Sequence, residues 1–333
     1  MSCLKFIHHP LIRTINFKAM NTKAVIAKGF QLPGHFFFSN YFYGLCAVAL
    51  SIEASLQQQF PLNGFLYYFL VFITTVLYYS YPYIKKTTKP TTNPRTLWYN
   101  EHYQLMRWNQ IIITIILSIA LMLFLKDHGS EVLQMTLRQW MVLTVFPIVA
   151  ALYYGSSSGM GKYNLRRIGW LKPFVIGFTW AGLVTVYPVL FHSIINKQEY
   201  APGWIGLLLF IKNFMFITLL CIMFDVKDFA TDSLYRMRTF VVRLGLRTTV
   251  VYLLLPLALI GLGTFIYYAT THQFNWVKVS LNTIPFILLI LVAISLLRRR
   301  RPLLYYLIVV DGLMLVKAVC GILAMLYFQR SLS

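Results

Sequence analysis

The sequence predicts an all-α integral membrane protein, a bundle of nine transmembrane helices. The 333-residue chain is 58% hydrophobic and only 12% charged, so a soluble domain of this size would lack the polar surface to cover itself. Its apolar residues fall into stretches long enough to cross a bilayer. Its basic residues gather in alternate connections between those stretches, as in multi-pass membrane proteins.

Apolar stretches bounded by charge, Pro or Gly define the expected spans in chain order. They cover residues 36–56, 64–84, 110–125, 139–155, 173–195, 203–224, 248–270, 279–297 and 303–328. The third and fourth are short. No repeat or long polar stretch indicates a second folded domain. We therefore expect a basic cytoplasmic tail (1–34), one transmembrane domain (35–328) and a short C-terminal tail (329–333).

The distribution of positive charge predicts the orientation. A net charge of +21 would suit nucleic-acid binding, but 23 of the 30 Lys and Arg precede span one or follow the even-numbered spans. The positive-inside rule then places the N-terminus in the cytoplasm and the C-terminus outside, and we expect a bacterial inner membrane. The tail lacks a signal peptide's apolar core and cleavage site, and Met20 is an alternative start to Met1.

Three of the nine carboxylates lie within eight residues, at the end of span six. Acids beside an apolar helix are costly without a cation. In a helix, positions i, i+3 and i+7 share one face, about 10 Å long at 1.5 Å per residue, the scale of a magnesium–diphosphate site. We predict Asp225, Asp228 and Asp232 as Mg²⁺ ligands. The alternative is an interfacial salt-bridge patch, since Arg236 follows Asp232 at i+4.

The segment FDVKDFATDSLYRMRTFVVRLG resembles the second signature of the UbiA superfamily of intramembrane prenyltransferases. The matched positions are the D-x-x-x-D pair Asp228 and Asp232, the preceding acid Asp225, and the tail Arg238-Thr239 and Arg243-Leu244-Gly245. The resemblance implies a UbiA-type bundle over roughly residues 35–328. It also implies Mg²⁺-dependent transfer of a prenyl group from a polyprenyl diphosphate to a lipophilic acceptor, with Asp228 and Asp232 as catalytic residues.

The family's first Asp-rich motif has no match at the end of span two, where Leu77-Tyr-Tyr-Ser80-Tyr-Pro-Tyr-Ile-Lys85-Lys86 stands. Three alternatives stay open. In the first, cations bind the diphosphate directly, and we name Lys85, Lys86, Arg95 and Arg238 for this role. In the second, Glu101 folds back toward span two and supplies the missing carboxylate. In the third, catalysis is lost, and the protein is a relative that binds isoprenoid or anionic lipid or scaffolds partners. The competing interpretation of the lysines is topology and attraction to anionic lipid.

Two ionisable residues lie inside span nine, Asp311 and Lys317, where such residues indicate a functional site. Six residues apart, they are expected to face different ways, and we expect Asp311 to meet Lys212 or Asn213. Tyrosines of span two could line a tunnel and shield a carbocation, or belong to an aromatic belt. They are Tyr67, Tyr68, Tyr78, Tyr79, Tyr81 and Tyr83. A transporter is disfavoured, because no paired broken helices or inverted repeat is visible.

Overall fold

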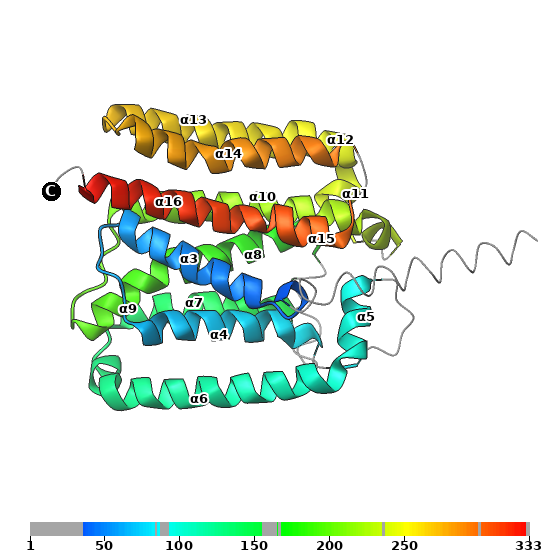
Figure 1. The fold of residues 1–333 in the computed structure, drawn as a ribbon. Coiled ribbons are helices and arrows are strands. Elements are labelled where there is room, and N and C mark those ends of the chain that lie inside the picture. Colours follow the sequence, from blue (N-terminus) through cyan, green and yellow to red (C-terminus); the bar gives the residue numbers. More distant parts are fainter. Residues whose placement is uncertain are drawn as a thin grey trace, which may run out of the picture.

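The computed structural model describes residues 36–83, 85–86, 93–154, 165, 168–234, 237–298 and 301–330. These residues form helices and short connections, and no strand occurs among them. Figure 1 shows the long helices running side by side as one bundle.

The elements follow one another up and down the bundle. They are α3 (Tyr41–Gln57), α4 (Phe65–Ser80), η1 (Tyr81–Tyr83), α5 (Pro94–Glu101), α6 (Tyr103–Leu133), α7 (Leu137–Tyr154), α8 (Lys172–Ala181), η3 (Gly182–Val186), α9 (Tyr187–Ile195), α10 (Trp204–Leu234), α11 (Phe240–Leu244), α12 (Leu246–Thr248), η4 (Thr249–Leu254), α13 (Leu255–Thr271), α14 (Trp276–Leu296), α15 (Leu303–Tyr305), η5 (Tyr306–Val310) and α16 (Gly312–Arg330).

Among the described residues, eight continuous helices are long and apolar enough to cross a membrane. They cover 65–83, 103–133, 137–154, 172–195, 204–229, 246–271, 276–298 and 303–327. The predicted all-α membrane bundle is confirmed at this level. The first expected span corresponds to α3, which has 17 residues and is not among the eight, so the count of nine stays a prediction.

Two helices run well past the expected span limits. α6 has 31 residues where a span of 110–125 was expected, and α10 continues beyond 224 through all three aspartates to Leu234. Charged residues end the apolar stretch that lies in lipid, but Asp, Lys and Arg in the last turns do not stop a helix. The boundaries drawn at charges were therefore too short.

Three π-helical segments interrupt the spans at η3, η4 and η5. Pro188 and Pro256 follow the first two, and proline removes a backbone donor and crowds the preceding turn, which favours a wider turn there. The third precedes Asp311, whose backbone N–H reaches the carbonyl of Tyr306 at 2.9 Å. Such π segments are frequent near functional sites.

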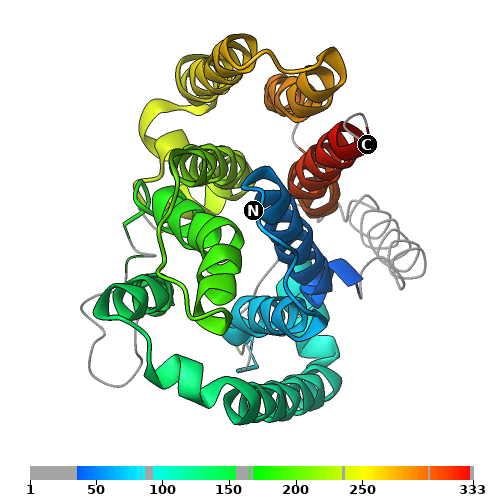
Figure 2. The ribbon, with the colours of Figure 1, turned by 90° about the vertical axis from the view of Figure 1, so that its left-hand side faces the viewer.

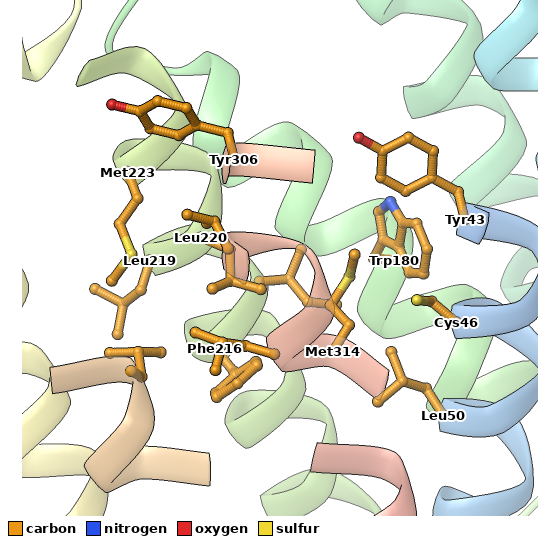
Figure 3. Close-up of a cluster of buried hydrophobic side chains, with 14 of the residues drawn as sticks. Tyr43, Cys46, Leu50, Trp180, Phe216, Leu219, Leu220, Met223, Tyr306 and Met314 are labelled. Atoms are coloured by element: carbon orange, nitrogen blue, oxygen red, sulfur yellow. The ribbon is translucent and has the colours of Figure 1, made fainter. Parts of the chain in front are cut away.

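α3 lies in the middle of the bundle. Figure 2, viewed along the helices, shows it between α16 and the pair α8 and α10, and it packs on α4, α16 and η3. A core of buried side chains joins these helices, including Leu50, Phe216 and Met314 (Figure 3). Close approach of α8 to α10 requires Gly177, because a Cβ there would collide with Thr218. Small residues serve this purpose widely in membrane bundles.

The chain direction brings one set of helix ends together. The start of α3, the ends of α4 and α10 and the start of α8 lie at the same end of the bundle as α5 (Figure 1). This end of the bundle is referred to below as the α5 end. The distribution of positive charge predicted that the connections after spans two and six lie on the same side of the membrane. Their position at one end of the bundle (Figure 1) agrees with that prediction.

Candidate functional site

The last turns of α10 hold the three aspartates. Asp225 is fully buried, and its Oδ1 accepts a hydrogen bond from Lys172 Nζ at 2.7 Å. Lys172 begins α8, with Pro173 at the second position of the helix, where its missing N–H costs nothing. Asp225 Oδ2 has no hydrogen-bond partner among the described residues. The pair therefore neutralises the charge but leaves one carboxylate oxygen available.

Asp228 and Asp232 differ in their surroundings. The Asp228 side chain is 36% exposed and pairs with Lys227 at 2.7 Å. Asp232 is buried, and its Oδ2 is without a partner within the described structure. Burial raises the pKa of Asp232 to about 6, because the charged form loses solvation. A buried carboxylate oxygen without a donor is unusual in proteins, and a bound cation would satisfy it.

A cavity of about 140 Å³ opens beside Asp228 at the α5 end. Its charged lining residues are Lys172, Asp228 and Asp311, from α8, α10 and the start of the last span. Its other walls are mainly aromatic and aliphatic, and include Tyr43, Tyr79, Trp180, Phe224 and Met314. The cavity therefore combines opposite charges at one side with an apolar interior.

Three aromatic side chains in the cavity wall are joined to one another and to Asp311 by two hydrogen bonds and one stacking contact. Trp180 Nε1 donates to the Tyr79 hydroxyl at 2.6 Å, and the Tyr79 and Tyr43 rings stack with centroids 4.5 Å apart. The Tyr43 hydroxyl in turn donates to Asp311 Oδ2 at 2.5 Å. Figure 3 shows Tyr43 and Trp180 on neighbouring helices. Residues from α3, α4, α8 and the segment just before α16 thus place one aromatic surface and one carboxylate around the same space.

The expected partner of Asp311 was wrong. Lys212 donates to Asn282 at 3.4 Å and Asn213 donates to Thr185 at 2.8 Å, both far from Tyr43 along the bundle. Lys212 lies near the start of α10, whereas Asp311 lies near the start of α16. Because the two helices run in opposite directions (Figure 1), these positions fall at opposite ends.

Lys317, in contrast, has a partner that the sequence analysis missed. Its ammonium lies 2.6 Å from Glu53 Oε2, and both side chains are almost fully buried. This ion pair joins α3 to α16. The apolar core that joins α3, α10 and α16 includes Leu50, Phe216 and Met314. Ionisable residues inside two expected spans were the available signal, but the sequence does not say which spans are neighbours.

Arg95 ties α5 to the start of α3. Its guanidinium donates to the carbonyl of Phe38 at 3.2 Å and to Asn40 Oδ1, and it lies 5.2 Å from the centre of the Tyr83 ring. Asn40 has φ 70°, a conformation that Asn tolerates, and its amide donates to Ser80 at 3.0 Å. Arg95 is not among the cavity-lining residues.

The other cations predicted to bind diphosphate lie outside the cavity. Lys85, Lys86 and Arg238 are exposed, as is Glu101. The backbone at Arg238 and Thr239 packs against Gly169, where a Cβ would come within 2.6 Å of Thr239 N. Lys172, which the sequence analysis counted only toward topology, is the cation that lines the cavity. Arg236 lies outside the described residues, and so does its expected pairing with Asp232.

The carboxylates at the end of α10 are the candidate ligands for Mg²⁺. Among the described residues, no three His, Cys, Asp or Glu side chains are placed to share one metal ion. Mg²⁺ usually takes only one or two carboxylates, completing its shell with water and substrate phosphate. The accessible Asp228 carboxylate and the unpartnered oxygen of Asp232, four residues further along α10, fit that smaller demand.

Comparisons with protein-family models, with curated proteins and with solved structures found no match. The resemblance to the UbiA superfamily therefore stays a prediction based on the segment from Phe224 to Gly245. What the structure adds is independent of it: a small cavity with carboxylates, one lysine and an aromatic wall, at the end of a membrane bundle.

Proposed function

We propose that the protein is a UbiA-like membrane prenyltransferase, which transfers a prenyl group from a polyprenyl diphosphate to a lipophilic acceptor. The observation that carries the proposal is the cavity at the α5 end, where Asp228 and Lys172 meet the aromatic wall of Tyr43, Tyr79 and Trp180. Charged groups suit the diphosphate, and aromatic faces suit the electron-poor prenyl carbon.

In the proposed architecture, α3 also crosses the membrane, which brings the number of spans to nine. Its 17 residues extend about 26 Å at 1.5 Å per residue, close to the ~30 Å hydrocarbon core. With nine spans the charge bias places the α5 end in the cytoplasm and the C-terminus outside, and a bacterial inner membrane is the proposed location. The cavity would then open where soluble prenyl diphosphates and cytoplasmic magnesium are available.

Donor binding is assigned to the acids and to Lys172. Asp228 and Asp232 would hold Mg²⁺ against the diphosphate, and the bound ion would stabilise the diphosphate as a leaving group. Lys172 adds a second positive charge from the α8 side. The exposed cations Lys85, Lys86 and Arg238 are proposed to steer the anionic donor toward this end of the bundle rather than to bind it directly.

The reaction requires three events that the cavity residues can serve. The bond between the prenyl carbon and the diphosphate oxygen breaks, and its electron pair leaves with the diphosphate. The acceptor then bonds to the prenyl carbon and releases a proton. Tyr79 and Trp180 face the positive carbon, and Asp311, held by the Tyr43 hydroxyl, takes the proton. Water is excluded by the apolar walls.

The test measures Mg²⁺-dependent binding of geranyl, farnesyl and longer prenyl diphosphates to the purified protein in nanodiscs. Asp228→Asn and Asp232→Asn should each remove the metal-dependent part of binding, because both a ligand and a charge are lost. Glu101→Gln, an exposed acid at the same end, is the matched control and should bind as the parent does. Unchanged binding in both aspartate variants would contradict the proposal.

A second candidate, a non-catalytic isoprenoid- or anionic-lipid-binding protein, is favoured by the existing ion pairs. Asp225 and Asp228 are each held by a lysine at 2.7 Å, and 140 Å³ is small beside typical ligand sites of 300–1,000 Å³. This candidate predicts that a prenyl diphosphate binds equally well with or without Mg²⁺ and is released unchanged.

A further inference from the structure

A second and larger cavity lies at the opposite end of the bundle. It measures about 430 Å³ and is enclosed by α7, η3 and the start of α10, within the size range of small-molecule sites. None of its lining residues belongs to the cavity at the α5 end. The proposed transfer reaction does not use it.

The inner wall of this cavity is apolar and well packed. Phe146 contacts Phe210 and Phe178, with ring centroids 6.2 and 5.0 Å away. Phe146 can lie against η3 only because residue 182 is glycine, since a Cβ there would collide with the ring. Gly182 therefore allows Phe146 of α7 to pack closely on η3 at this wall.

The outer side of the cavity opens toward the surface that would face lipid. Two of its lining residues, Trp204 and Leu207, are 69% and 46% exposed and lie at the start of a span. An apolar surface here is continuous with the hydrocarbon of the bilayer. Tryptophan is typical of the zone where hydrocarbon meets headgroups, so the cavity spans both zones.

Two polar groups at the cavity edge are available for a ligand. Arg138 is exposed and forms no ion pair with a described residue. It lies near the buried Tyr200, whose pKa is raised by burial and lowered by the charge of Arg138. Gln58 is fixed through its amide, which donates to the carbonyls of Ala54 and Thr185 at 3.2 and 3.1 Å. An unneutralised arginine beside an apolar cavity is complementary to an anionic amphiphile.

We propose that this cavity binds a membrane phospholipid with an anionic headgroup, whose phosphate pairs with Arg138 and one of whose acyl chains lies against Phe146 and Phe210. Arginine forms two parallel hydrogen bonds with phosphate. The chain enters from the side, between Leu207 and α7, without leaving the bilayer. The site is therefore selective for charge at its edge and tolerant of chain length in its interior.

The test uses quenching of Trp204 fluorescence in nanodiscs by lipids with brominated acyl chains. The Trp204 signal is the difference between the parent and Trp204→Phe. Brominated phosphatidylglycerol is titrated against brominated phosphatidylcholine, so that only the headgroup differs. We expect phosphatidylglycerol to be favoured about five- to tenfold, the effect of one cation at the membrane surface.

Variants distinguish a specific lipid-binding site from unselective contact of lipid with an apolar surface. Arg138→Gln should reduce the preference for phosphatidylglycerol to about one, Arg138→Lys should keep most of it, and Lys126→Gln should keep all of it, since Lys126 is an exposed cation of α6 at the same end. Val142→Phe should fill the cavity and weaken quenching by both lipids. Equal quenching of the parent by both lipids, or an unchanged preference in Arg138→Gln, would overturn the proposal.

Discussion

Replacing Lys172 with Met removes the cation from a carboxylate that has no access to solvent. Asp225 is 0% exposed and its Oδ1 lies 2.7 Å from Lys172 Nζ, while Oδ2 already lacks a donor within the described structure. Removing one partner of a buried ion pair typically costs about 3–5 kcal/mol, because the remaining charge stays buried without compensation. Lys172 is 18% exposed, so we expect the lower end, about 3 kcal/mol.

The assay is thermal unfolding of the purified protein in one detergent, followed by intrinsic fluorescence. A loss of about 3 kcal/mol corresponds to a decrease in the midpoint of roughly 4 °C for a chain of this size, because the unfolding entropy is about 2.1 cal/mol/K per residue. The double variant Lys172→Met with Asp225→Asn should recover most of the decrease, because no uncompensated charge remains. Lys227→Met is the control. Its partner Asp228 is partly exposed, so this variant should lose no more than about 1 kcal/mol of unfolding free energy.

Two results would refute this reasoning. A midpoint for Lys172→Met within a degree of the parent would show that Asp225 is stable without the lysine. A double variant as unstable as the single one would show that Lys172 acts through packing rather than through charge. Either result would also remove the argument that Lys172 and Asp225 share a charged site.

Three further predictions concern Asp232, the ion pair of Lys317 with Glu53, and Arg95. Mn²⁺ binding to the protein alone, measured by electron paramagnetic resonance, should weaken as the pH falls through about 6, because the pKa of Asp232 is raised by burial to about 6 and the protonated carboxyl does not bind metal; Asp232→Asn should show no such step. Lys317→Met should destabilise the protein by about 3–5 kcal/mol in a denaturant titration, since it leaves Glu53 charged and buried, and Glu53→Gln in the same chain should restore part of that loss. Arg95→Gln should accelerate amide hydrogen exchange within α5, because its bonds to Phe38 and Asn40 hold that helix; a variant whose α5 stays protected while donor binding is lost would instead favour direct diphosphate binding by Arg95.

Features that depend on local sequence were predictable. Apolar length and the alternation of charge give the membrane bundle, because each expected span is recognised from its own residues. The three aspartates could be placed on one helix at the end of a span for the same reason. Their neighbourhood could also be anticipated in part, since helices that alternate in direction bring alternate connections to the same end.

Features that depend on which helices are neighbours were not predictable. Tyr43 and Asp311 are separated by 268 residues, and Lys317 and Glu53 by 264. Either contact requires the identity of the adjacent spans and the rotation of each helix about its axis. Arg95 was assigned to the diphosphate because its connection is basic where the family's first acidic motif is missing. Its partners in the structure are a backbone carbonyl and a side-chain amide, and uncharged groups of this kind leave no charge pattern in the sequence.

The most direct test of the central claim is diphosphate release. The parent protein in nanodiscs is incubated with Mg²⁺, a panel of prenyl diphosphates and an extract of lipophilic acceptors, and inorganic diphosphate and prenylated product are quantified together. We expect equimolar diphosphate and product with at least one donor, lost in Asp228→Asn and kept in Glu101→Gln. Binding of prenyl diphosphates without any release, or release that Asp228→Asn leaves unchanged, would contradict it.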